Sequence, residues 1–268
     1  MTTPENVIPA LIADGNDVDG LLADLDDAQW GLPTPSEGWT IAHQVAHLAA
    51  TFHLAAMAAS QPEGFVAMTK QLSPDFGANV DAAMAPFLAA PPQVLLGHWR
   101  SERANAEQAL ASVPAGKVVP WLVRPLPATV LAAAGMMELF GHGQDIADAL
   151  GVRREFTDRI AHLVGFAVRT WDFGYLSRNL TPPEVEFRFE LTLPSGAPFV
   201  SGPENAEQRI TGPSVDFCLL VTRRRHRDDL DLVATGPDAE QWLNIAQAYR
   251  GPAGPGRRPG QFATAHRP

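Results

Sequence analysis

The chain has 268 residues, 46% of them hydrophobic and 19% charged, a composition typical of globular proteins rather than disordered ones. Its 30 acidic and 20 basic side chains give a formal net charge of −10, which argues against nucleic acid as a partner. No apolar run reaches the ~20 residues that span a membrane, and the start of the chain lacks the features of a signal peptide. We therefore expect a cytoplasmic protein with no membrane partner.

The single cysteine and the longest basic run have plain structural interpretations. Cys218 has no second cysteine to pair with and lies in the apolar run 217–221, so we interpret it as a buried small side chain rather than a nucleophile. The run Arg223–Arg227 is followed at once by two aspartates. We interpret it as a helix C-terminus, where basic residues offset the helix dipole, rather than a binding patch.

The pattern of apolar residues in the first half of the chain predicts long amphipathic helices. Apolar residues recur at spacings of three and four over 6–28, and after a Pro- and Gly-rich loop at 31–39 the pattern resumes behind Thr40, which is a suitable N-cap. The region 61–91 is predicted to hold a short helix between loops. Helices follow at about 93–113 and 128–150, and the last one stops at Gly151. Four long helices predict an antiparallel bundle whose interior can hold metal ligands.

The pattern changes after residue 155. One more helix is predicted at about 156–179, and the segment 185–193 then alternates apolar and polar residues as a half-buried strand does. Short strands at 199–201, 207–211 and 230–235 and helices at 214–224 and 238–249 complete a small α+β domain. The predicted organisation is therefore a helical domain at 1–155, a linker helix with an α+β domain at 156–250, and a disordered tail at 251–268.

Two helices carry side chains suited to metal binding. Glu138 and His142 are four residues apart on the predicted helix 128–150, so they project from the same face. A carboxylate and an imidazole are suitable ligands for zinc or a similar divalent ion, but two ligands leave the shell unfinished. On an earlier helix, His47 lies among apolar neighbours, where an unpartnered imidazole would be costly. Each feature alone is also compatible with a surface pair or a satisfied core histidine.

The two segments together resemble a known family. Trp30 and the stretch Pro35-x-x-Gly38-Trp39-Thr40-Ile41-x-x-Gln44-Val45-Ala46-His47-Leu48 are similar to one motif of the DinB/YfiT-like superfamily. Within it, the branch of mycothiol-dependent maleylpyruvate isomerase is the most similar. The stretch Glu138-x-x-x-His142-x-x-Asp145-x-Ala147-x-Ala149-x-Gly151 resembles the second motif of that branch.

This resemblance implies a specific fold and site. It implies a DinB-like four-helix bundle followed by a sterol-carrier-like α+β domain. It also implies that His47, Glu138 and His142 together hold one divalent metal ion, zinc first among the options, and that mycothiol is a thiol cofactor. Three protein ligands would leave a position open for water or substrate, as in catalytic zinc sites.

Several other residues are assigned secondary roles. His43 stands where the family more usually has Asp or another polar residue, and it is considered as an outer-shell group, a substrate contact or an alternative ligand. Asp145, three residues after His142, is considered either as the group that orients that imidazole or as a surface carboxylate. His53 is expected to lie elsewhere on the helix wheel, and His98 and Trp99 to face either the cavity or the core. Other positions that could hold a thiol or substrate are Arg169, Trp171, Arg178 and Arg223–Arg225. His162 and His226 show no partner pattern.

Three functions remain open at this level. The first is a metal- and thiol-dependent isomerase or thiol transferase that acts on a small electrophile. The second is a thiol-independent metal enzyme, such as a lyase, hydrolase or cyclisation catalyst of specialised metabolism. The third is a non-enzymatic metal-dependent protein that binds a small molecule. An apolar face on the bundle is also compatible with a homodimer.

Overall fold

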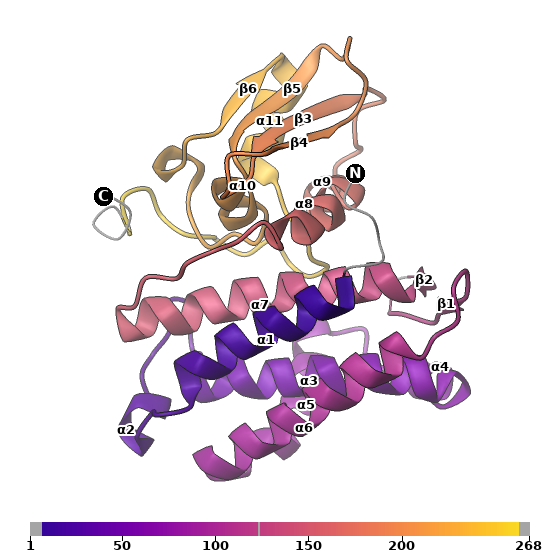
Figure 1. The fold of residues 1–268 in the computed structure, drawn as a ribbon, viewed down its shortest axis with the longest axis vertical. Helices are drawn as coiled ribbons and strands as arrows, with labels where there is room; N and C mark the ends of the chain where they lie inside the picture. The colour runs from indigo at the N-terminus through magenta and orange to yellow at the C-terminus, as the bar shows by residue number, and fades with distance from the viewer. Residues whose placement is uncertain (1–6, 123, 263–268) are drawn as a thin grey trace. The chain divides into compact units, whose positions relative to one another are not determined.

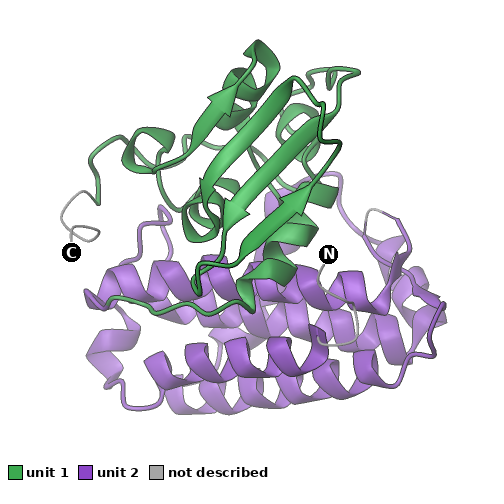
Figure 2. Ribbon diagram, turned by 45° about the horizontal axis from the view of Figure 1, so that its top comes forward, with its two compact units in different colours: residues 1–3, 153–268 green, residues 4–152 purple. Residues whose placement is uncertain are grey.

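A computed structural model describes residues 7–122 and 124–262 of the chain (Figure 1). Contacts divide the chain into two compact units, Pro4–Val152 and Arg153–Pro268 with Met1–Thr3 (Figure 2). The first unit ends where a long helix stops at Gly151, whose left-handed φ of 67° suits a residue without a Cβ. The predicted boundary at 155 falls three residues after Val152.

The first unit is helix-rich. Within its described residues the long helices are α1 (Val7–Leu22), α3 (Ile41–Ser60), α6 (Pro92–Ala111) and α7 (Ala128–Leu150). Shorter elements connect them, namely α2 (Asp27–Trp30), α4 (Pro62–Thr69), α5 (Phe76–Leu88), β1 (Val118–Val119) and β2 (Leu126–Pro127). The region 61–91 therefore holds two helices where one was predicted. Asp75 provides the missed start signal, since its side chain accepts a hydrogen bond from the backbone N–H of Ala78.

The long helices do not all run antiparallel. Helix α1 opposes α6, because Asp19 pairs with Arg100 and Asn16 with Arg103. Helices α3 and α6 instead run in the same direction. His53 of α3 pairs with Glu102 of α6, and the last turns of both helices line one cavity. The prediction of a purely antiparallel bundle is corrected here, because α4 and α5 carry the chain back before α6 begins.

The core of this unit lies between the long helices. Its largest fully buried side chains include Trp30, Trp99, Leu11, Ile41 and Leu48, and burial of one large apolar side chain contributes about 1.5–3 kcal/mol. Helices α1 and α7 approach closely at Gly135, where an added Cβ would lie 3.2 Å from a methyl carbon of Leu11. None of the helices within the described ranges has both the length and the apolar character needed to cross a bilayer.

The second unit contains a small mixed sheet. Its helical elements are α8 (Ile160–Arg169), α9 (Phe173–Leu176), α10 (Ser214–Val221), the 3₁₀ turn η2 (Arg227–Asp229) and α11 (Pro237–Ile245). Its strands are β3 (Phe187–Thr192), β4 (Pro198–Ser201), β5 (Gln208–Pro213) and β6 (Val233–Thr235), in the order β4-β3-β5-β6. Strands β3 and β5 are parallel and the other two pairs are antiparallel. The predicted helix 156–179 is split into α8 and α9, and the predicted strand 230–235 starts three residues later, at Val233.

Aromatic side chains form the core of the second unit. Phe187, Phe189 and Leu191 alternate as the buried positions of β3, as the period-two pattern predicts. Rings of Phe189, Phe217 and Trp242 contact one another, and the Trp242 indole donates to the carbonyl of Trp171 at 2.8 Å. Residues 259–262 of the predicted tail form a turn, and the backbone N–H of Gly260 donates to Asp229. Residues 263–268 lie outside the described residues.

Candidate metal centre

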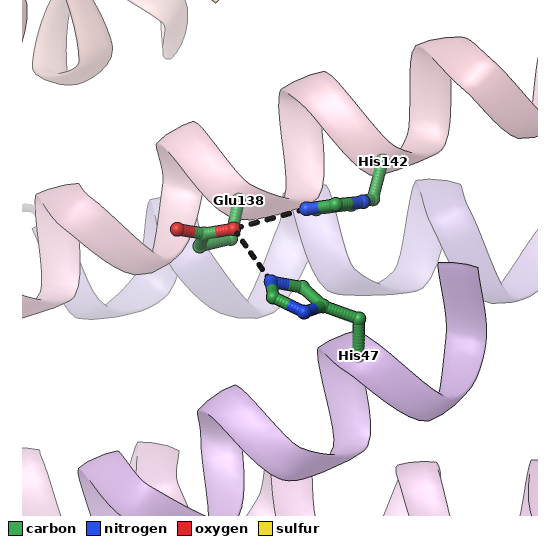
Figure 3. A group of neighbouring side chains, drawn as sticks. All are labelled: His47, Glu138 and His142. Atoms are coloured by element: carbon green, nitrogen blue, oxygen red, sulfur yellow. Dashed lines mark hydrogen bonds and ion pairs between the residues drawn. The ribbon is translucent and has the colours of Figure 1, made fainter. Parts of the chain in front are cut away.

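His47, Glu138 and His142 lie together between α3 and α7 (Figure 3). The Glu138 Oε2 atom is 3.1 Å from His142 Nε2 and 3.5 Å from His47 Nε2. The two imidazole rings have their centroids 4.5 Å apart. Each residue offers one ligand atom, and all three atoms lie within 4.8 Å of one another. The structure thus brings together the three residues singled out as metal ligands.

Two features of the helices create this arrangement. Glu138 and His142 are one turn apart on α7, so they share a face of that helix. Helix α3 crosses α7 with opposite direction, and Phe52 of α3 lies beside Gly135 of α7 one turn farther along the contact. The side chain of His47 therefore points toward the side chains of Glu138 and His142 (Figure 3).

The donor set fits a divalent metal ion of the zinc type. Two imidazole nitrogens and one carboxylate oxygen are ligands that zinc accepts, with bonds of about 2.0–2.2 Å. Ligand atoms of a tetrahedral site with such bonds lie roughly 3.3 Å apart. The observed separations of 3.1 Å and 3.5 Å from the carboxylate oxygen bracket this value. The same three residues would supply about one negative charge to balance a doubly charged ion.

The carboxylate of Glu138 is held in its charged form. Burial by itself would raise its pKa, but the hydrogen bonds with His142 and His47 and their charges outweigh burial and hold the pKa of Glu138 well below its ordinary value. The side chains of His47 and Glu138 are each 21% exposed and that of His142 is 12% exposed. The cluster is therefore partly desolvated yet open to a small ligand.

An aromatic ring lies against the two histidines. Trp39 comes from the loop before α3, and its ring stacks on His142 with a centroid distance of 6.0 Å and an interplanar angle of 21°. Its centroid is 5.4 Å from that of His47. The loop is closed by hydrogen bonds from the backbone N–H and the hydroxyl of Thr34 to the Trp39 carbonyl, at 2.8 Å and 2.9 Å. This loop thus holds an apolar wall beside the cluster.

Sequence reasoning missed a role for Gln44, one turn before His47. Its side chain is fully buried, and its Oε1 atom is 2.5 Å from Nδ1 of His142. Its amide nitrogen donates to the hydroxyl oxygen of Thr34 at 2.8 Å and to the carboxylate of Asp145 at 3.4 Å. A polar residue at a core position of an apolar helix was the available signal, because buried amides need partners.

The two residues considered as outer-shell groups are placed differently from each other. His43 is the third residue of α3 and takes part in an N-cap: its Nδ1 atom is 2.8 Å from Thr40 Oγ1 and accepts from the Thr40 backbone N–H. Asp145 is fully buried, which replaces the alternative of a surface carboxylate. It accepts hydrogen bonds from Ser36 at 2.8 Å and from Gln44. Asp145 is thus linked to His142 through Gln44.

The remaining candidates of this unit lie outside the cluster. His53 points toward α6, where its Nδ1 atom is 3.1 Å from Glu102. His98 is exposed and contacts the edge of Phe87, whereas Trp99 is fully buried in the core. These positions therefore contribute to helix packing or surface contacts.

Candidate residues of the second unit have contacts of their own. Arg178 donates to the backbone carbonyls of Gly174 and Ile245, at 2.8 Å and 3.0 Å. The ring of Trp171 packs on Phe187 with centroids 4.9 Å apart. Helix α10 ends at Val221 just before the arginine run. Cys218 is fully buried, and Arg169 is exposed. His162 is half-buried, and burial lowers its pKa. His226 accepts a hydrogen bond from the backbone N–H of Asp228.

Two family models match the chain. The model described as the mycothiol maleylpyruvate isomerase N-terminal domain matches residues 13–147, about half of the chain, including all three members of the cluster. A model described as wyosine base formation matches residues 186–235 in the second unit.

The regions matched by similar proteins cover both units of the chain. Two uncharacterized proteins of Mycobacterium tuberculosis, from strains CDC 1551 and ATCC 25618, are each 42% identical over 257 residues, which is 96% of this chain and 100% of the relative. The crystal structure of the mycothiol-dependent maleylpyruvate isomerase is similar with a TM-score of 0.55 and 18% identity, over 81% of this chain and 88% of that one. A histidine-to-alanine mutant of that enzyme gives a TM-score of 0.57 and 16% identity, over 88% and 95%. At this identity the likeness concerns the fold.

Proposed function

The chain belongs to the family of the mycothiol maleylpyruvate isomerase N-terminal domain, and from this premise we propose that it is a divalent-metal-dependent enzyme that uses a low-molecular-weight thiol. The proposed thiol is of the mycothiol type, and the second substrate is a small electrophile. The observation that carries the proposal is the convergence of His47, Glu138 and His142 on one point. The bundle is proposed to be of the DinB type and the second unit of the sterol-carrier type.

His47, Glu138 and His142 would hold the metal ion, most suitably zinc. When bound, such an ion supplies positive charge that lowers the pKa of a thiol or water beside it and so favours the anionic nucleophile at neutral pH. The charged carboxylate of Glu138 would balance part of the ion's charge, and its Oε2 atom lies 3.5 Å and 3.1 Å from the imidazole nitrogens that would bind the ion with it. Trp39 shields one side of the two histidine rings from water.

The reaction class follows from a thiolate and an electrophilic double bond. Addition forms a carbon–sulfur bond, and the electron pair of the double bond moves to the electron-withdrawing group of the substrate. If the thiolate leaves again after bond rotation, the net result is cis–trans isomerisation. If the adduct instead takes up a proton and keeps the sulfur, the product is an S-conjugate. Both outcomes need the same site, so we propose isomerisation or thiol transfer.

The experiment is a comparison of metal content and thiol binding in the wild type and in His47→Ala. We expect about one divalent ion per chain in the wild type, thiol binding that requires the ion, and loss of both in His47→Ala. His53→Ala is the matched control, because it removes another histidine of α3 that lies outside the cluster. A wild-type protein without bound metal would contradict the proposal. Metal binding without any thiol binding would instead favour a thiol-independent metal enzyme, and a ligand retained after metal removal would favour a binding protein.

A further inference from the structure

We infer that Gln44 is a positioning residue that fixes the proton of His142 on Nδ1 and thereby presents Nε2 to the metal ion. This inference rests on the proposed metal centre. It concerns hydrogen bonds that connect the loop before α3 to the cluster through one buried amide. A neutral imidazole carries one proton, and only the nitrogen without it can bind a metal. The group that faces the other nitrogen therefore decides which atom is available.

The orientation of the Gln44 amide is set from two sides. The Thr34 hydroxyl donates to the carbonyl of Trp39 at 2.9 Å, so its oxygen is left to accept, and it accepts from the nitrogen of Gln44 at 2.8 Å. The carboxylate of Asp145 also faces this nitrogen, at 3.4 Å, and an ionised carboxylate only accepts hydrogen bonds. A flipped amide would direct its carbonyl oxygen at two acceptors. The nitrogen therefore faces Thr34 and Asp145.

The consequence for His142 is direct. With its nitrogen oriented in this way, Gln44 presents its carbonyl oxygen to Nδ1 of His142 at a distance of 2.5 Å. Two acceptors at this distance would repel each other, so a proton lies on Nδ1. The Nε2 atom faces Glu138 and the space that His47 also borders. In the metal-free protein Nε2 donates a hydrogen bond to the Glu138 carboxylate, and a bound ion would take the place of that hydrogen while Nδ1 keeps its own. Because Gln44 is fully buried, no water competes for this hydrogen bond, and the ring orientation is fixed before the ion binds.

The loop 31–40 is thus part of the metal centre although it supplies no ligand. Thr34 holds the amide of Gln44, Ser36 donates to Asp145 at 2.8 Å, and Trp39 stacks on the imidazole that the amide orients. Outer-shell partners of metal-binding histidines typically contribute about 10- to 100-fold in metal affinity. The same range is expected for Gln44.

The test is the zinc affinity of Gln44→Met, measured by competition with a chelator. Methionine has a similar length, and its thioether is only a weak acceptor for Nδ1–H, so we expect the Kd to rise about 10- to 100-fold. Gln144→Met is the matched control. Gln144 is also buried, on α7, and donates to Asp148 rather than to a member of the cluster. Its removal should leave the zinc affinity unchanged. In addition, the zinc-loaded wild type should show a slowly exchanging Nδ1–H resonance of His142 in NMR spectra, and Gln44→Met should lose this protection.

A second pair of variants serves if Gln44→Met does not fold. Thr34→Val removes the hydroxyl that accepts from Gln44 but keeps the backbone hydrogen bond from Thr34 to Trp39. It should weaken zinc binding in the same direction, and Thr34→Ser should restore it. Wild-type affinity in Gln44→Met, or in Thr34→Val, would overturn the inference and leave the metal centre standing. A wild type that binds no zinc would instead overturn the proposed function together with this inference.

Discussion

Two histidines of helix α3 each pair with a glutamate of another helix, at similar distances but in different surroundings. His47 lies 3.5 Å from Glu138, and His53 lies 3.1 Å from Glu102. The shorter pair is the more exposed one, with 53% of the His53 side chain accessible compared with 21% for His47. A second imidazole lies beside the His47 pair, and the indole of Trp39 is tilted against His47 and stacked on that second imidazole.

The comparison shows that a short contact by itself does not identify a functional site. An exposed pair keeps its side-chain freedom and is screened by water, so breaking it costs little free energy. The half-buried pair shares its carboxylate oxygen with a second imidazole, that of His142, and the Nδ1 atom of His142 contacts Gln44. Convergence of three donors and support from buried hydrogen bonds are what we expect of a metal site and do not expect of a surface ion pair.

The largest expected effect compares Glu138→Gln with Glu102→Gln. The amide at 138 keeps the size of the side chain but removes the negative charge that two imidazoles and the ion share. We expect zinc affinity to fall by more than about 100-fold, beyond the range of outer-shell changes. Glu102→Gln alters the exposed pair in the same way and should change the affinity less than about twofold. Equal losses in both variants would contradict the distinction between the two pairs.

A second prediction concerns acid stability of the metal-free protein. The folded pKa of Glu138 lies below its ordinary value of 4.5, so the carboxylate stabilises the fold at pH values above 4.5. That contribution is lost as the pH falls from there toward the folded pKa, because the unfolded chain then binds the proton more strongly. Denaturant unfolding between about pH 3 and 7 should therefore show a steeper acid loss in the wild type than in Glu138→Gln. Identical slopes would show that Glu138 is not held in its charged form.

The smallest expected effect is the coupling between His53 and Glu102. A double-mutant cycle with His53→Ala and Glu102→Ala should give an interaction free energy of about 0.2–1 kcal/mol in unfolding experiments near neutral pH. Salt should reduce it further, since exposed charges are screened. A coupling of several kcal/mol would mean that this pair is as well supported as the half-buried pair of His47 and Glu138, and the comparison would fail.

Local periodicity identified most elements of the fold. The spacing of apolar residues predicted α1, α3, α6 and α7, and alternation predicted β3. The errors lie where local signals compete: the split between α8 and α9, and the extra helix α5 behind its Asp75 cap. The parallel course of α3 and α6 was missed because helix direction depends on how α4 and α5 return the chain.

The sequence by itself determined that Glu138 and His142 share a helix face, because a spacing of four residues fixes this in any α-helix. It also placed His47 on an apolar helix, and the family resemblance joined it to the pair. Only the tertiary structure decided that α3 crosses α7 at this point and that Gln44 stands between Asp145 and His142. Such contacts join residues about a hundred positions apart, and their geometry depends on the packing of whole helices rather than on local spacing.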